Sequence, residues 1–596
     1  MDAISRRDID FLLHDWLRVE TLAAHPRFEG QSREDYDAVL DLAGKIAAKL
    51  GESWKISDSE EPRLDQDGLV RVQPDLREGV QEYFASGLQL SSVDEAHGGM
   101  QLPFVVSMGI AAQCMAANVA AAAFPMLSTA NARVTTAFGT EAQIAAFAAP
   151  LHSGEAMGTM CLSEPDVGSS LGDITTKARA EGEDDLGRRH RIFGRKMWIS
   201  VGDQDVAPQT IHLVLAKIER EDGTLPPGSK GISLFLVPKI LPDGARNDVQ
   251  VIGLNHKMGY RGTPNTLLNF GEGDRFQPGG DAGAVGWLIG APGQGLAIMF
   301  QMMNEARISV GLGAAALTYR GYLASKTYAE ERVQGRPLDD KRAEKPVPLT
   351  RHADVRRMIL AQKAAAEGAL ALCLYAAKLA DLGESEDAAE REKAEGLLGI
   401  LTPIVKTWPS EMGLIANQHA IQIHGGYGYT RDFDVEQIYR DNRLNPIHEG
   451  TTGIQGLDLL GRKMLFDGMK SFALLMAEIR GEIAACADGP LSAQAAALEG
   501  ACAQVEAAAA KAAEGDPAAA LTHGSQVLHA MGHLVVGWLW LSQTRAAQGA
   551  GDDALAQAKL WACRYFFAYE APMIAAWLAP LMAGDDTTGA VPEAAL

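Results

Sequence analysis

The sequence predicts a multi-domain α+β protein: an N-terminal helical domain, a middle β domain, a helical bundle and an extra C-terminal helical domain. Its 596 residues suggest about four domains at about 150 residues each. Ala-rich helical windows precede residue 157, short β-rich runs follow it, and helical periodicity returns at residue 295. The expected segments are an N-terminal helical extension (1–35), a helical domain (36–157), a β domain (158–275), a catalytic helical bundle (276–465) and a C-terminal helical domain (466–596).

The first helical domain contains the longest apolar stretch of the chain, "MGIAAQCMAANVAAAAF" at 108–124. This stretch is shorter than a membrane span and contains Gln113 and Asn118, so we expect a buried helix. The N-terminus has acidic residues at once and no long apolar segment, so we expect no signal peptide.

The β domain is predicted from three runs rich in β-forming residues, at 209–218, 231–240 and 248–254. They are separated by "EDGTLPPGSKG" and "LPDGARN", which favour turns. The glycines of residues 290–295 have the order GxxGxG, with no βαβ unit around them and no acid at the expected distance. A dinucleotide-binding fingerprint is therefore rejected in favour of a loop that leads into a helix.

The last 130 residues or so are Ala-rich, with Gly/Pro breaks at "ADGPLSAQ" and "AEGDPAAA". Large apolar residues in "VLHAMGHLVVGWLWLSQ" and "LWACRYFFAYEAPMIAAWLAPLM" predict a folded helical domain rather than a disordered tail.

The charge excludes several classes of partner. With 54 basic and 76 acidic residues the net charge is −22, which repels nucleic acid and anionic membranes but leaves room for a local anion pocket. The six cysteines lie far apart, with no metal-ligand spacing and no disulfide framework. We expect a cytoplasmic protein with no metal site and no membrane or nucleic-acid partner.

Three motifs could carry chemistry. "MCLSEPDVGSS" (160–170) joins an acid to small and hydroxyl residues that allow close approach of a ligand, although most such clusters are plain turns. In "WIS", Trp198 and Ser200 would face one side of a strand; a core tryptophan with an incidental serine is the simpler reading. Gly425 and Gly426 could approach a flat or phosphorylated ligand or simply end a helix.

A further motif, "NPIHEGTTGIQGL", places Glu449 on a loop before a helix. Pro446 and Ile447 favour a non-helical approach, and Thr451 is a suitable N-cap. An apolar stripe at helical spacing follows and consists of Ile454, Leu457, Leu460 and Met464. Taken alone, Glu449 could be an acid that offsets the helix dipole, worth about 0.3–1 kcal/mol.

Five motifs in this order, "SEPDVGSS", "WIS", "NEAR", "IHGGYGYTRD" and "IHEGTTGIQ", resemble the acyl-CoA dehydrogenase family of flavoproteins. The resemblance covers about residues 36–465. The motifs "NHKMGYRGTPNT" and "EERVQGRPL", with the C-terminal extension, are similar to a large bacterial subgroup of about 600 residues.

The resemblance implies an FAD cofactor, with Glu449 as the base that removes the α-proton and flavin N5 as the hydride acceptor. The residues that it assigns to FAD are Met160, Leu162, Ser163, Ser169, Trp198, Ile199, Ser200, Arg332, Gln422, Gly425, Gly426, Thr451 and Gly453. The residues that it assigns to the substrate are Ser169, Asn304, Arg307 and Gly450. In the family, the equivalents of Arg332, Gln422 and the glycine pair reach the FAD of a neighbouring subunit, which implies a homodimer or a larger assembly.

Three features depart from the family pattern. In the family, an aromatic residue is common at the position of His424, and an aspartate is common at the position of Asn304. The family segment that follows the position of Arg332 is one residue longer and contains a phenylalanine. These departures concern adenine packing and CoA contact. His448 could tune the pKa of Glu449 or merely pack.

The resemblance implies α,β-dehydrogenation of an acyl-CoA, with an electron-transfer flavoprotein as acceptor. An acyl-CoA oxidase that uses O₂ and a non-catalytic helical scaffold are the alternatives. The subgroup favours a short acyl group such as 3-methylmercaptopropionyl, from dimethylsulfoniopropionate (DMSP) degradation; ordinary short- to medium-chain acyl groups remain open. Dimer and tetramer, and the role of the C-terminal domain, also remain open.

Overall fold

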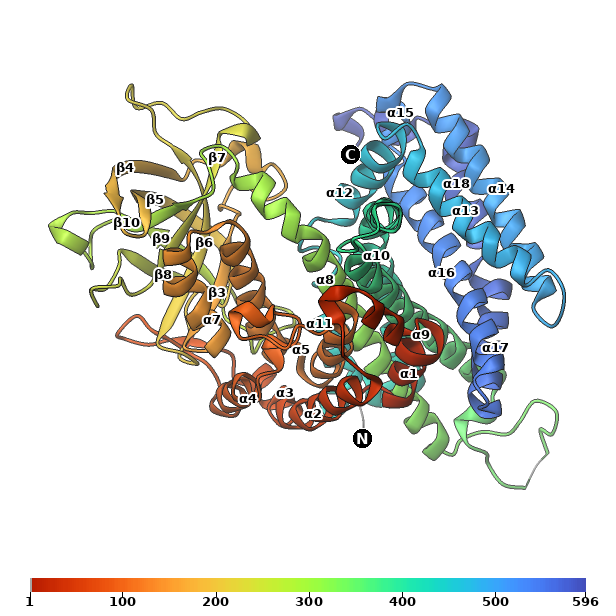
Figure 1. Ribbon diagram of the computed structural model, residues 1–596. Helices are drawn as coiled ribbons and strands as arrows, with labels where there is room; N and C mark the ends of the chain where they lie inside the picture. The colour runs from red at the N-terminus through yellow and green to blue at the C-terminus, as the bar shows by residue number, and fades with distance from the viewer. Residues whose placement is uncertain (1–2, 343) are drawn as a thin grey trace. The chain divides into compact units, whose positions relative to one another are not determined.

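The computed structural model describes residues 3–342 and 344–596 and contains the predicted β domain and helical domains (Figure 1). The α+β fold class is therefore confirmed. The chain divides into two compact units. Unit 1 comprises the N-terminal segment to Leu40, Leu102–Ala116 and Arg307–Leu596. Unit 2 comprises Asp41–Gln101 and Ala117–Ala306.

The β domain in unit 2 is an eight-stranded, mostly antiparallel sheet. Its strands are β3 (Ala156–Cys161), β4 (Lys177–Asp184), β5 (Gly187–Ser200), β6 (Gln209–Ile218), β7 (Ile232–Pro238), β8 (Val249–Leu254), β9 (Asn265–Phe270) and β10 (Ala284–Ile289). The order is β10-β7-β6-β4-β5-β9-β8, with β3 parallel to β6. Because β10 pairs with both β7 and β5, the path closes on itself.

The three predicted β-rich runs form β6, β7 and β8. The sheet also includes β10, which lies beyond the end at residue 275 that the sequence predicted for the β domain. All six residues of β10 are buried, so its sequence "AVGWLI" has no alternation of apolar and polar residues to mark it as a strand.

The central strand β6 is buried on both faces of the sheet. Ile211, Leu213 and Leu215 pack into one apolar cluster, and Val214 and Ala216 pack into another. The alternation follows from the two-residue period of a strand, so one continuous apolar run supplies two separate cores.

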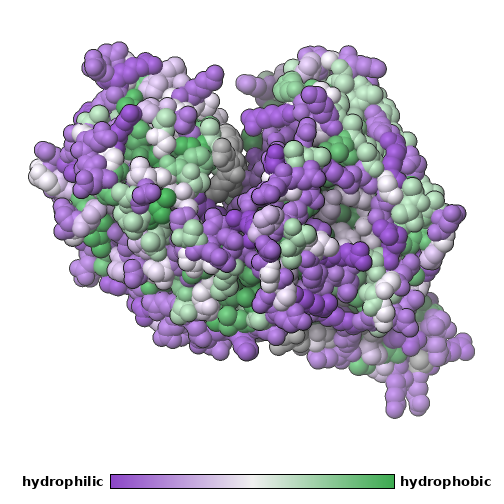
Figure 2. All heavy atoms as spheres, viewed as in Figure 1, coloured by the Kyte–Doolittle hydropathy of each residue, from purple (hydrophilic) through white to green (hydrophobic). Residues whose placement is uncertain are grey.

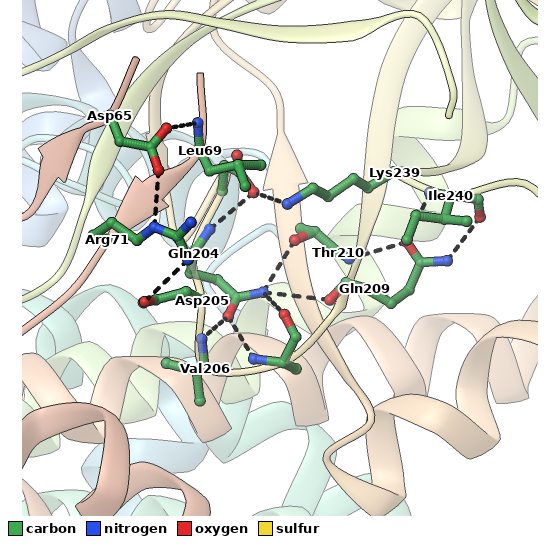
Figure 3. A network of polar contacts seen from close by, with 12 residues as sticks. Asp65, Leu69, Arg71, Gln204, Asp205, Val206, Gln209, Thr210, Lys239 and Ile240 are labelled. Atoms are coloured by element: carbon green, nitrogen blue, oxygen red, sulfur yellow. Dashed lines mark hydrogen bonds and ion pairs between the residues drawn. The ribbon is translucent and has the colours of Figure 1, made fainter. Parts of the chain in front are cut away.

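A polar network joins a short hairpin of unit 2 to the loop before β6 (Figure 3). The hairpin consists of β1 (Arg63–Leu64) and β2 (Val70–Arg71). Arg71 Nε donates to Asp65 at 2.9 Å, and Arg71 Nη1 lies 3.7 Å from Asp205. Nearby, Lys239 pairs with the buried Asp203. The network therefore anchors the loop that directly follows Ser200.

Helices form the rest of unit 2 and continue into unit 1. The shorter ones in unit 2 are α3 (Trp54–Ser59), α4 (Pro74–Ala85), α6 (Glu141–Gln143) and α7 (Ala149–Ser153), and α1 (Arg6–Asp10) lies in unit 1. Helices α2 (Arg33–Glu52) and α5 (Phe104–Phe138) each belong partly to both units. Helix α5 contains the predicted buried stretch 108–124 and is interrupted by non-helical backbone at Asn118.

Long helices dominate unit 1. The bundle consists of α8 (Gly295–Glu331), α9 (Ala353–Leu382), α10 (Ala388–His424), α11 (Val435–Asn442) and α12 (Thr452–Leu457). Helix α8 belongs to unit 1 only from Arg307 onward. The C-terminal domain consists of α13 (Lys470–Ala485), α14 (Ser492–Glu514), α15 (Pro517–Leu521), α16 (Gly524–Gly549), α17 (Asp553–Tyr565), α18 (Met573–Ala583) and α19 (Thr587–Ala590). Helix α8 follows the 290–295 loop, as predicted, and α13, α14 and α15 are separated at the predicted breaks.

Among the residues that the structure describes, three helical segments are long and apolar enough to cross a membrane by length and composition. The most apolar windows of Phe104–Phe138 and Ala353–Leu382 are 89% and 72% buried, whereas that of Asp553–Ala583 is 22% buried. The apolar surface of the first two segments is therefore mostly buried inside the protein. Purple, hydrophilic residues predominate on the face shown in Figure 2.

A buried ionic cluster connects the two ends of the chain within unit 1. Lys559 Nζ of α17 donates to Asp8 at 2.5 Å and to Glu367 of α9 at 2.8 Å. Lys363 also pairs with Glu367. Lys559 is fully buried and both acids are nearly so, which means that each charge depends on the others for solvation.

Candidate active site

Glu449 lies on the loop between α11 and α12, as the sequence predicts. Its backbone has φ of 53°, a left-handed conformation that costs energy for a residue with a side chain. Thr451 caps α12, since its hydroxyl accepts the N–H of Ile454 at 3.4 Å. The non-helical approach and the N-cap are therefore confirmed, and the strained conformation at Glu449 is a feature that the sequence did not reveal.

The apolar stripe predicted after Glu449 is only half correct. Leu460 and Met464 are buried, but Ile454 and Leu457 are 37% and 43% exposed. The two exposed residues lie in α12, and the two buried ones lie in the π-helical segment η12 (Asp458–Leu465), which follows it directly. Its wider turn moves later residues to a different face than a regular helix would.

Two basic groups act electrostatically on the Glu449 carboxylate. Burial raises the pKa of Glu449, and the positive charges of Lys406 and Arg307 oppose that rise. Lys406 is buried in α10 and its Nζ donates to the carbonyl of Gly450 at 2.7 Å. Arg307 of α8 is paired at 2.7 Å with Asp458. A carboxylate with a raised pKa beside a carbonyl-anchored lysine is suited to take up a proton.

His448, beside Glu449, is neutral in this environment. Burial, with a smaller contribution from Lys406, lowers the pKa of His448 to about 3. Its Nε2 lies 3.0 Å from Asn445 Oδ1. His448 therefore adds no positive charge next to Glu449 at neutral pH.

The backbone of Glu449 offers a donor. Its carbonyl accepts from Gln455 Nε2 at 2.9 Å, which fixes the orientation of the Glu449–Gly450 peptide. Within the part of the chain that the structure describes, no acceptor is recorded for the Glu449 N–H. An N–H outside the helical ladder can donate to a developing oxyanion.

A second group of predicted residues lies in unit 2, around the end of β5. Ser163 and Met197 exchange two hydrogen bonds: Ser163 Oγ donates to the Met197 carbonyl at 2.7 Å, and Met197 N donates to the Ser163 carbonyl at 3.0 Å. Ile199 is buried, Ser200 is half-buried and accepts from Asn265 at 3.2 Å, and Trp198 is 60% exposed. Trp198 has φ of 66° at an irregularity of the β5–β9 pairing. The structure therefore presents an indole at the surface of this unit.

A buried ion pair supports this strand end. Lys196 Nζ donates to Glu164 at 3.2 Å and to the Leu162 carbonyl at 2.9 Å. Glu164 also accepts from the hydroxyls and backbone N–H groups of Thr175 and Thr176 at 2.6–2.9 Å. Burial alone would raise the pKa of Glu164, but Lys196 and these donors lower it to about 2. The pair holds the 160–170 loop against β5.

The lowered pKa of Glu164 predicts a pH dependence of stability. Ionised Glu164 stabilises the fold above its unfolded pKa, and this contribution is lost as the pH falls from that value towards 2. In thermal melts between pH 7 and pH 3, the Glu164→Gln protein should lose less stability over this range than the wild type. Glu155→Gln, at an exposed acid just before β3, should keep the wild-type slope. Equal slopes for wild type and Glu164→Gln would refute the role of the pair.

A third group lies where α8 and α10 end, within unit 1. Arg332, directly after α8, lies over the ring of Tyr427 at 5.9 Å. Gly425 ends α10 with φ of 61°, so the glycine pair does terminate a helix. Gln422, Gly425 and Gly426 are exposed, and a Cβ at either glycine would meet no atom within 4 Å. The structure thus brings the predicted Arg332 and glycine-pair residues to one open surface.

Three further predicted residues have few recorded contacts that bear on their roles. Ser169 is on an exposed loop, Asn304 is half-buried on α8, and Gly453 is in the first turn of α12 with open space around it. The sequence did not predict Lys406 or Asp458. A charged residue inside the apolar run "LTPIVKTW" was the available signal for Lys406.

Comparison with known proteins adds to this geometry. Family models match residues 159–272 ("Acyl-CoA dehydrogenase, middle domain"), 293–465 ("Acyl-CoA dehydrogenase, C-terminal domain") and 475–592 ("Acetyl-CoA dehydrogenase C-terminal like"). A 3-methylmercaptopropionyl-CoA dehydrogenase of Ruegeria pomeroyi is 34% identical over 489 residues, which are 80% of this chain and 79% of that protein. The chain belongs to the acyl-CoA dehydrogenase family. The family and subgroup suggested by the motifs are confirmed.

Two further relatives support the assignment. The broad-specificity linear acyl-CoA dehydrogenase FadE5 of Mycobacterium tuberculosis is 33% identical over 92% of this chain and 90% of its own. An acyl-CoA dehydrogenase of Bacillus anthracis, solved with FAD, has the same fold, with a TM-score of 0.71 at 22% identity over 96% of this chain and 91% of its own. This acyl-CoA dehydrogenase is thus a flavin-dependent oxidoreductase with FAD as cofactor, and it acts on an acyl-CoA.

The residues present fit FAD. The exposed indole of Trp198 offers a flat apolar face of the kind that packs on an aromatic ring system. Arg332 carries a charge suited to a pyrophosphate, next to glycines that leave its surroundings open. These two groups belong to different units, and each fits its part of the cofactor by itself.

Proposed function

We propose that this acyl-CoA dehydrogenase converts an acyl-CoA thioester to the 2-enoyl-CoA, with Glu449 as the base. The observation that carries the proposal is the raised pKa of Glu449, held in a left-handed conformation with an N–H that finds no acceptor in the described chain. An N-terminal acid that only offset a helix dipole would need neither a raised pKa nor this backbone strain.

In this proposal, Glu449 removes the α-proton of the thioester. An α-proton of a thioester is too weakly acidic for an ordinary carboxylate in water, and partial desolvation makes Glu449 a stronger base. Its N–H donates to the thioester oxygen as negative charge develops there. Bound FAD supplies the hydride acceptor, at flavin N5. Gln455 fixes the carbonyl of Glu449 and thereby stabilises the loop that carries this N–H.

We propose that the residues assigned to FAD from the sequence contact this cofactor. Trp198 and Ser200 contact the flavin ring from the β domain, together with the loop that contains Met160, Leu162 and Ser163. The groups near Arg332 and Gly425 contact the FAD of a second subunit, as in the family. A homodimer follows from this assignment, and sedimentation of the holoenzyme tests it. We also propose a cytoplasmic enzyme that passes electrons to an electron-transfer flavoprotein.

For the substrate we propose a short acyl-CoA, with 3-methylmercaptopropionyl-CoA, and hence a place in DMSP degradation, as the leading candidate. The relative from Ruegeria pomeroyi supports it, and the similarity to FadE5 supports ordinary linear acyl chains as the second candidate. Flavin bleaching by a panel of 3-methylmercaptopropionyl-, butyryl-, octanoyl- and palmitoyl-CoA separates the two. We expect 3-methylmercaptopropionyl-CoA to bleach the flavin fastest, whereas a faster rate with butyryl- or octanoyl-CoA would favour an ordinary linear acyl chain. Faster bleaching by palmitoyl-CoA would refute the short-chain proposal.

A further inference from the structure

Lys406 is a charged residue in a place where charge is costly. It lies in the middle of α10, its side chain is fully buried, and it is one of the largest fully buried side chains of the described chain. Buried lysines almost always need a partner. The recorded acceptor of Lys406 Nζ is the Gly450 carbonyl, one residue after Glu449.

The hydrogen-bonding capacity of this ammonium is not exhausted. An ammonium has three N–H donors, and the Gly450 carbonyl takes one of them at 2.7 Å. Among the residues that the structure describes, no carboxylate lies within ion-pair distance of Lys406 Nζ. Its charge is therefore not neutralised by a dedicated partner.

The other charged groups around Glu449 differ from Lys406 in whether a partner already neutralises their charge. Arg307 on α8 is already paired with Asp458 on η12, and His448 is neutral at pH 7. Glu411, on α10 itself, acts on Lys406 in the same direction as Glu449. Burial lowers the pKa of Lys406 to about 8 against the opposing effect of Glu449 and Glu411, so most of it stays protonated at neutral pH. Lys406 is thus the cation whose charge is directed chiefly to the Glu449 carboxylate.

We propose that Lys406 is a positioning residue for the reaction: it anchors the Glu449 loop through Gly450 and supplies a buried positive charge that favours the ionised form of the Glu449 carboxylate. This inference rests on the proposed role of Glu449 as the base. Burial alone favours the protonated form of Glu449, which cannot accept a proton. Lys406 offsets part of the burial effect without forming an ion pair that would occupy the carboxylate.

Three substitutions separate the charge from the hydrogen bond. Lys406→Met removes both, Lys406→Gln keeps an N–H donor without the charge, and Lys406→Arg keeps the charge. A matched control is Lys393→Met, which removes a lysine of the same helix that pairs at the surface with Glu478. The measurement is the rate of flavin bleaching in the holoenzyme between pH 5 and pH 9, with the fastest ester of the panel described above.

We expect the acidic limb of the pH–rate profile to move up by about one pH unit in Lys406→Met and Lys406→Gln, since an opposite charge nearby shifts a pKa by about 1–3 units. At a pH below both limbs the rate should fall about 10-fold. Lys406→Arg and Lys393→Met should keep the wild-type limb. Lys406→Gln serves as the test if the methionine protein does not fold, because it still satisfies the Gly450 carbonyl.

Several results would overturn the inference. An unmoved limb in both neutral variants is one, and a limb that moves equally in Lys406→Arg is another. If neither neutral variant accumulates as yellow protein while Lys406→Arg does, Lys406 is purely structural. Glu449→Gln, measured alongside, separates this failure from that of the proposed function. If the Glu449→Gln enzyme bleaches at the normal rate, Glu449 is not the base, whatever the Lys406 variants do.

Discussion

Glu449→Gln should retain FAD but lose flavin bleaching by acyl-CoA, with a rate at least about 10³-fold below the wild type. General base catalysis contributes about 10²–10⁴-fold, and a carboxamide cannot accept the α-proton. The substitution keeps the size of the side chain and the backbone N–H, so binding of the cofactor and the acyl-CoA should change little. Rapid-mixing measurement of flavin absorbance after addition of the acyl-CoA ester gives the rate.

The control for this prediction is Glu478→Gln, an acid of α13 that pairs with Lys393 at the surface. It should bleach at the wild-type rate. Unchanged bleaching in the Glu449→Gln protein would exclude Glu449 as the base. Loss of yellow colour on purification would instead show that Glu449 is needed to bind FAD.

The pH dependence of the wild-type enzyme follows from the same group. Because the pKa of Glu449 is raised, the fraction of ionised base increases with pH through a range above the ordinary carboxyl value. Activity therefore rises with pH in this range. The raised pKa also means that ionisation of Glu449 lowers the stability of the free protein, as expected for a partly desolvated base.

Some parts of this protein could be predicted from its sequence because local patterns determine them. The strands β6, β7 and β8 lie within a few residues of the predicted runs, and Thr451 caps α12 as its position before an apolar pattern indicates. Turn-forming segments and N-caps act over a few residues, so their signal is present in the sequence itself.

Other features depend on tertiary packing, which local patterns do not contain. Strand β10 is buried on both faces and has no two-residue period, and the π-helical turn after α12 changes which residues face inward. The positive φ values of Glu449 and Trp198 belong to residue types that rarely adopt them, so no sequence rule points to them. The roles of Lys406 and Asp458 require knowing which helices meet.

Lys559→Met should be the most destabilising substitution of a residue far from Glu449. It removes the cation that Asp8 and Glu367 share and leaves Asp8 with a buried charge whose remaining recorded hydrogen bond comes from the Tyr319 hydroxyl at 3.3 Å. Breaking a buried ion pair by removing one partner costs about 3–5 kcal/mol. Thermal unfolding should therefore begin several degrees lower than in the wild type. Lys511→Met, at an exposed lysine of α14, should change the transition little.

Two further measurements test the cause of that loss. Asp8→Asn in the Lys559→Met background should restore part of the stability, because it removes the uncompensated charge. The deficit of Lys559→Met should also shrink as the pH falls. Burial already raises the pKa of Asp8, and loss of Lys559 raises it further, so the native state binds more protons than the unfolded chain. A deficit that is independent of pH and of Asp8→Asn would mean that Lys559 acts through packing alone. A pH-dependent deficit would show that the C-terminal helical domain is held to the N-terminal helix by charge.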